Sequence, residues 1–193
     1  MMLMRVGGLK SNRNVKCNKF FFLLLCIFFS SFFLTGKVFA ESDYVLPYPG
    51  IMPGSYYYIF SQSIDYFRNW WSFGNLSQFT YHLSMADKKL VEAKTLFEYR
   101  QYLLASKALS SYQNHLKTAD FFLKNAKEEG KDTSQKKALF FKAIEKHNDV
   151  LEKIKSDTPS VFVWQPERES ATTIEIHDMI FKAIALGGTY TGK

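Results

Sequence analysis

Apolar residues recur at alternating spacings of three and four along most of the chain after residue 56. This spacing places them on one face of an α-helix. One such stripe runs over residues 79–97 and another over residues 105–126. Both are heptad-like, which is typical of helices that pack along one another. The pattern therefore predicts long amphipathic helices that share a core.

The two stripes differ in phase, because Phe97 and Ala105 are separated by eight residues where seven would keep register. One extra residue rotates a stripe by about 100°. A single helix from Asn75 to Glu129 would be about 80 Å long and would leave its stripe uncovered. We therefore predict a tight turn within residues 98–101, although neither glycine nor proline marks it.

A separate helix is predicted before this hairpin, over residues 57–71. Four large residues at spacings of four, three and four predict its buried face: Phe60, Ile64, Phe67 and Trp71. Gly74 should end it. Asn75 with Gln78 resembles a capping box, which predicts that the first hairpin helix begins there.

Two further helices are predicted after the hairpin. A stripe over residues 140–154 predicts a fourth helix, and a short extended run follows at residues 160–164. A last short helix is predicted to begin at Thr172, with Glu175 as its capping-box partner. The pair Gly187-Gly188 should stop it.

Residues 41–56 contain three prolines and two glycines, which exclude a regular helix. Their large apolar side chains are unusual for a solvated linker, so we predict an extended strap. The predicted fold is an all-α antiparallel bundle or hairpin of long helices, preceded by the strap and an N-terminal signal helix. The predicted divisions are residues 1–40 (leader), 41–56 (strap), 57–156 (bundle) and 157–193 (C-terminal extension with a short helix).

The leader has the order of a secretory signal peptide. Five basic residues precede an apolar run over residues 20–34, and Ala40 and Glu41 flank the predicted cleavage site. As a helix the run would be about 22 Å long, against about 30 Å for a hydrocarbon core. Cleavage is therefore favoured, with residues 20–40 as an uncleaved inner-membrane anchor the alternative. Either fate predicts an extracytoplasmic protein: secreted, periplasmic or on the cell surface.

Removal of the leader changes the composition. The whole chain has a net charge of +7, but residues 1–40 hold six basic and no acidic residues, which leaves +1 for the remainder. Nucleic-acid binding through bulk charge is therefore not expected. Both cysteines, Cys17 and Cys26, lie in the leader, so the processed chain could form neither disulfides nor cysteine-based sites.

No catalytic residues are assigned, since phosphate loops, nucleophile elbows and Glu-x-x-His pairs are absent from the sequence. His147 falls on an apolar stripe, where a hydrogen-bonded core histidine is favoured over a metal ligand. Glu92, Glu98, Glu128 and Glu129 lie among lysines, and we expect them on a solvated charged face. No cofactor and no metal site is predicted.

An aromatic-rich stretch supplies the candidate contact surface: Tyr58, Tyr66, Trp70 and Trp71. Adjacent indoles cannot both face one core on a helix, so at least one should lie near the surface. Aromatic rings are more often core than ligand platform, and packing of one face on the bundle is the favoured reading.

Two motifs together resemble a known family. Tyr44-Val45-Leu46-Pro47-Tyr48-Pro49-Gly50-Ile51-Met52-Pro53 lies in the strap, and Ala86-Asp87-Lys88-Lys89-Leu90-Val91-Glu92-Ala93 lies on a predicted helix. This arrangement is similar to an exported bacterial helical family classed as domain of unknown function number 5667. The chain departs from it at Tyr56, where a proline is usual, and at its turn, Tyr99-Arg100-Gln101. The resemblance implies export and an all-α domain. Some relatives look like extracytoplasmic parts of membrane-tethered regulators of sigma factors.

These observations predict an exported, non-enzymatic helical domain that binds a protein of the cell envelope or forms part of it; the partner's identity is open. One alternative is a membrane-tethered extracytoplasmic sensor or regulator that keeps its leader as anchor. Another is a bundle that binds a small ligand or metal through His147 or the aromatic group. Exposed stripes would favour self-association.

Overall fold

The computed structural model describes residues 44–167 and 170–191. All of them belong to one compact unit, Ser42–Lys193. The predicted signal helix and the predicted cleavage site at Ala40 and Glu41 lie outside the described residues. None of the described helices has the length and apolar character needed to cross a bilayer.

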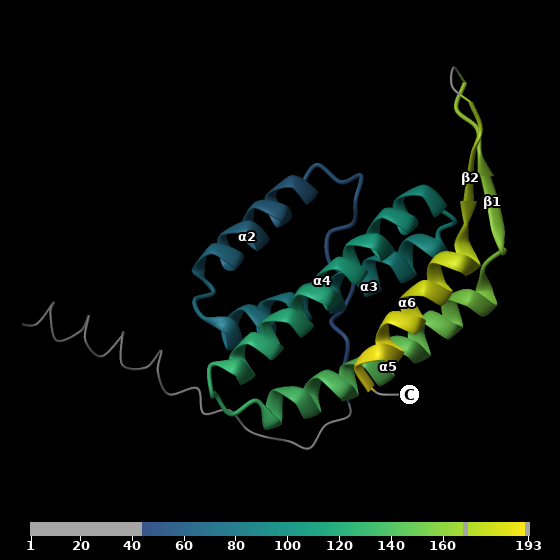
Figure 1. Ribbon diagram of the computed structural model, residues 1–193. Helices are drawn as coiled ribbons and strands as arrows, with labels where there is room; N and C mark the ends of the chain where they lie inside the picture. The colour runs from purple at the N-terminus through teal and green to yellow at the C-terminus, as the bar shows by residue number, and fades with distance from the viewer. Residues whose placement is uncertain (1–43, 168–169, 192–193) are drawn as a thin grey trace, which may run out of the picture. The chain divides into compact units, whose positions relative to one another are not determined.

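The centre of the fold is a hairpin of two long helices, α3 (Asn75–Glu98) and α4 (Tyr102–Glu128), which lie along each other (Figure 1). Three residues connect them, and Arg100 adopts a left-handed backbone with φ of 58°. The predicted turn is therefore confirmed, with arginine where glycine is usual. Every position of the two predicted stripes that begin at Phe79 and Ala105 is buried.

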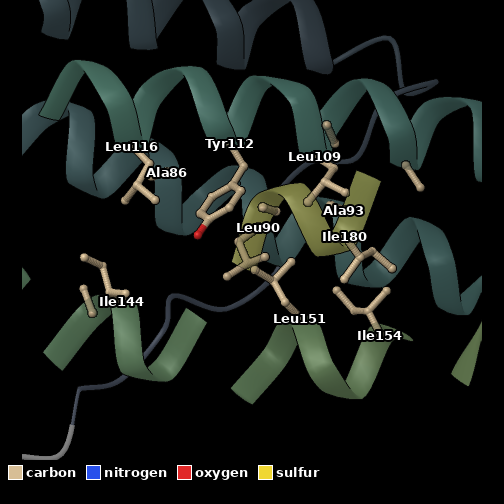
Figure 2. Packing of buried hydrophobic residues seen from close by; sticks show 14 of the residues in the cluster. Ala86, Leu90, Ala93, Leu109, Tyr112, Leu116, Ile144, Leu151, Ile154 and Ile180 are labelled. Carbon is tan, nitrogen blue, oxygen red and sulfur yellow. The ribbon is translucent and has the colours of Figure 1, made fainter. Parts of the chain in front are cut away.

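Helices α5 (Ser134–Asp157) and α6 (Ile176–Thr191) pack on this hairpin and complete the core. Figure 2 shows side chains of all four helices meeting, with Leu90 of α3, Leu109 of α4, Ile144 of α5 and Ile180 of α6 among them. These four side chains are fully buried. The helical core follows the apolar periodicity of the sequence.

The fold is mostly helical rather than all-α, because α5 and α6 are joined by a small antiparallel sheet. Strand β1 (Val161–Trp164) pairs with β2 (Thr172–Glu175). The predicted helix start at Thr172 is therefore wrong, and α6 begins four residues later. Thr172, Thr173 and Ile174 are β-branched and face another β-branched and aromatic run, which favours strand pairing over the capping box.

The predicted stop at Gly187-Gly188 is also wrong, because α6 continues to Thr191. A Cβ at Gly187 would lie 3.0 Å from both the Asn148 side-chain oxygen and the Ile144 Cγ2 of α5. Glycine at this position allows a close helix–helix approach rather than ending the helix.

Helix α2 (Tyr58–Trp71) forms as predicted, but its predicted buried face is wrong. Phe60, Ile64, Phe67 and Trp71 are all exposed, and no residue of α2 is buried. The segment before α2, from Tyr44 to Tyr57, contains neither helix nor strand. Its Leu46 and Met52 pack against the core.

Candidate functional site

Helix α2 turns its polar side toward the hairpin. Tyr58, Ser61, Asp65 and Asn69 recur at spacings of three and four, and they are the partly buried positions of the helix. α2 contacts α3 and stands apart from α5 and α6 in Figure 1. An amphipathic helix normally buries its apolar side, so α2 has the reverse orientation.

Ion pairing and hydrogen bonds hold the middle of α2. Lys88 of α3 forms an ion pair with Asp65, and its Nζ also donates to Ser61 Oγ at 3.0 Å. The Tyr81 hydroxyl donates to the backbone oxygen of Asp65 at 2.9 Å. These contacts are polar, so hydrogen bonds and charge attach α2 rather than apolar burial.

A second polar group holds the first turn of α2. Lys89 Nζ donates to Tyr58 Oη at 2.8 Å and to Glu92 Oε2 at 2.7 Å, and the Tyr58 hydroxyl donates to Glu92 Oε1 at 2.8 Å. Burial lowers the pKa of Lys89, but Glu92 and Tyr58 outweigh burial, so that pKa lies above its ordinary value. The expectation of a solvated Glu92 is wrong, since this side chain is buried and paired.

The side chain of Gln78 binds the C-terminal end of α2. Its side-chain amide donates to the backbone oxygens of Asn69 at 3.2 Å and Ser72 at 2.6 Å. The predicted capping box of Asn75 and Gln78 is wrong. Asn75 is the first residue of α3, but the N-cap is Gly74 and no side chain caps the helix. Gln78 instead satisfies carbonyl groups at the C-terminal end of α2.

The opposite side of α2 forms a continuous apolar surface, which we name the outward face. Its side chains are between 61% and 73% exposed: Ile59, Phe60, Ile64, Tyr66, Phe67, Trp70 and Trp71. At 100° per residue they span about 160° of the helix, and Ser63 is the one polar residue within that arc. Of the predicted contact residues, Tyr66, Trp70 and Trp71 belong to the outward face. Tyr58 points to α3.

A groove of about 820 Å³ runs beside the outward face. Ile64, Phe67 and the two tryptophans line its α2 side, and Ser77, Thr80 and Ser84 of α3 line the other. The groove is therefore lined by aromatic rings of α2 and by hydroxyl groups of α3. Trp70 and Trp71 meet edge to face, with ring centroids 6.1 Å apart.

His147 lies in a buried hydrogen-bonded network. Its Nε2 is 2.7 Å from Asp87 Oδ1, and its Nδ1 is 3.3 Å from the Tyr112 hydroxyl. Because a carboxylate can only accept, Nε2 carries a proton. The Tyr44 hydroxyl donates to the other Asp87 oxygen at 2.5 Å. Burial and then the Asp87 charge raise the pKa of Tyr44 far above its ordinary value. Both ring nitrogens of His147 are therefore engaged by the protein itself.

A histidine pair joins α3 to α4. His82 Nδ1 lies 3.0 Å from His115 Nδ1, and the His82 ring stacks on Phe122. Burial and then the neighbouring His115 lower the pKa of His82 to about 4. Within the described residues no three His, Cys, Asp or Glu side chains gather closely enough to hold a metal ion. The pair was not predicted, since its members are 33 residues apart in sequence.

Four neighbouring residues of α3 make most of these attachments: Asp87, Lys88, Lys89 and Glu92. We name them the polar anchor. They contact Tyr44 in the N-terminal segment, Tyr58 and Asp65 in α2, and His147 in α5. All four belong to the Ala86–Ala93 motif that carries the family resemblance. The motif therefore has a structural explanation, which its helical spacing alone did not reveal.

Comparisons with curated proteins and with solved structures find no match to this chain. A comparison with family models finds one over residues 50–160, described as "Domain of unknown function (DUF5667)". This range covers more than half of the chain and includes α2, the hairpin and the polar anchor. The chain therefore belongs to the DUF5667 family.

Proposed function

We propose that this protein is an exported, non-enzymatic helical domain that docks to another component of the cell envelope through the outward face of α2. One observation carries the proposal: α2 is amphipathic, yet it presents its apolar side to solvent. Seven large apolar side chains on one helix are more than the scattered apolar residues of an ordinary surface.

The polar anchor supports a binding role for this orientation. Lys88 and Lys89 satisfy Asp65 and Tyr58, so the polar side of α2 is already paired. Rotating the helix to bury its apolar side would break these contacts. The exposed face is thus a maintained feature of the fold, and an external partner would cover it.

The leader supports the proposed location. Its basic residues, apolar run and small residue at position 40 have the order that directs a chain to export. A retained leader would instead tether the domain to the inner membrane through residues 20–40. That arrangement supports the second candidate function, an extracytoplasmic sensor or regulator.

Site-specific photo-crosslinking tests the proposal. A benzophenone amino acid replaces Phe67 on the outward face or, as matched control, Phe181 on α6, which is similarly exposed at 62%. In host cells we expect adducts at position 67 and few at position 181, because only the first lies on the docking face. Equal adduct yields at the two positions would contradict the proposed function, whatever the identity of the partner.

A further inference from the structure

The outward face combines apolar bulk with amphipathic rings. Tyr66, Trp70 and Trp71 carry polar tips on large apolar bodies, and Phe60 and Phe67 lie between them on the helix surface. Tyrosine and tryptophan concentrate where hydrocarbon meets lipid headgroups. A helix with one broad apolar face and one polar face lies flat in that region.

The two charged side chains of α2 are compatible with a position at the surface of a bilayer. Its one acidic side chain, Asp65, is on the polar side and paired with Lys88. Its one basic side chain, Arg68, is exposed at the edge of the outward face. The outward face of α2 therefore carries no carboxylate that would repel an anionic headgroup, and the exposed guanidinium of Arg68 is available to pair with a lipid phosphate.

The apolar run of the leader precedes α2 by a short stretch of sequence. The apolar run over residues 20–34 ends 24 positions before Tyr58. Even fully extended, that stretch reaches no further than about 86 Å. If the leader is retained as an anchor, this length limits how far α2 can lie from the membrane.

We infer that the outward face of α2 is an interfacial membrane-binding surface, which inserts its aromatic rings into the headgroup region of a bilayer containing anionic lipid. This inference rests on the proposed function and names the docking partner as lipid. Stable membrane binding usually combines two or more weak attachments. In an anchored protein α2 would therefore supplement the leader, and after cleavage of the leader α2 would bind the membrane reversibly.

Tryptophan fluorescence tests this directly, because the whole sequence has three tryptophans and the leader has none. In the full chain, Trp164→Phe leaves Trp70 and Trp71 as the only emitters. This protein is reconstituted into vesicles of phosphatidylethanolamine and phosphatidylglycerol, with either plain or brominated acyl chains. We expect a blue-shifted emission that brominated lipid quenches about twofold. Leader insertion alone cannot produce that signal.

Two further variants in the same background locate the contact. Phe67→Glu places a charge in the middle of the outward face and should abolish the quenching. Phe121→Glu makes the same change on α4, at a side chain that is 56% exposed, and should leave the quenching intact. Neither side chain is buried, so circular dichroism should show unchanged helix content in both.

Equal emission in plain and brominated vesicles would overturn the inference. If Phe67→Glu then also abolished a concentration-dependent self-association in sedimentation, the occupant would be a second copy of this chain. If position 67 still formed protein adducts in cells, the occupant would be an envelope protein. In that last case the proposed function would stand while the inference about lipid would fall.

Discussion

Four charged residues of α3, the polar anchor, attach segments of the protein to one another. Glu92 is buried and bonded to both Tyr58 and Lys89, and Asp87 joins the N-terminal segment to His147. A hydrogen bond to a charged group is stronger than a neutral one. Single residues of α3 therefore determine where two sequence-distant segments lie.

Replacing Arg100 by glycine should stabilise the protein. The φ of 58° costs a residue with a Cβ about 1 kcal/mol, which glycine avoids. Glycine also increases the conformational entropy of the unfolded chain, which offsets part of this gain. We expect Arg100→Gly to raise the free energy of unfolding by up to about 0.5 kcal/mol in urea titrations. Tyr99→Gly is the matched control, since Tyr99 has an ordinary φ of −83°, and should lower that free energy. A less stable Arg100→Gly protein would contradict the prediction.

The histidine pair should make stability depend on pH. The pKa of His82 is about 4 in the folded protein against an ordinary value of 6.5. Between these values the unfolded chain binds more protons, so stability is complete above pH 6.5 and falls as the pH drops toward 4. His82→Phe keeps the stacking on Phe122 and removes this titration. Its unfolding free energy should decline less over that window, and parallel profiles for the two proteins would refute this.

At the scale of elements, the sequence predicts which side of a helix is apolar but not what covers it. In α3, α4 and α5 the stripes are buried, because each helix has a neighbour of matching length. In α2 the same apolar pattern gives an exposed face, since Tyr58 and Asp65 on its polar side pair with side chains of α3. Those partners lie 34 and 23 residues away. Nothing local in the sequence indicates such pairing.

The approach of α6 to α5 gives a prediction opposite to helix propensity. Alanine normally stabilises an exposed helix relative to glycine by about 1 kcal/mol. At Gly187 an added Cβ would press on fully buried Ile144 and on Asn148, so Gly187→Ala should lower the free energy of unfolding by about 1–2 kcal/mol. Thermal and urea unfolding would measure it. The addition of Asn148→Ala should restore part of the loss, and a Gly187→Ala protein more stable than the parent would rule out the crowding.

At the scale of the whole molecule, the described unit contains its own core, and the predicted leader lies outside it. The described residues hold a continuous apolar core of their own, which runs from α3 to α6. The leader supplies the targeting pattern and both cysteines. The core of the described unit therefore contains no cysteine, and a domain of this size can bury enough apolar surface to fold without a disulfide.

Mass spectrometry of the protein from its host would test this division. We predict a mature chain that begins at Glu41, because the small residue Ala40 follows the apolar run at the usual place for cleavage. A chain that begins at Met1 and fractionates with membranes would instead support the anchored alternative.

Hydrogen exchange should find α2 to be the first helix to open. Its attachment to α3 is by hydrogen bonds and ion pairs, which water replaces at a small net cost, while α3 and α4 share fully buried side chains. Amides of α2 should therefore exchange well before those of α3. Uniform exchange across the two helices would refute this ordering.

The reversed orientation of α2 also has a consequence for handling the protein. The helix expected to detach most readily is also the one with the large exposed apolar face, and a detached α2 could bring that face to other molecules more easily. High salt screens the ion pairs that hold α2, and warming strengthens apolar association. Either condition should therefore cause aggregation while the hairpin is still folded.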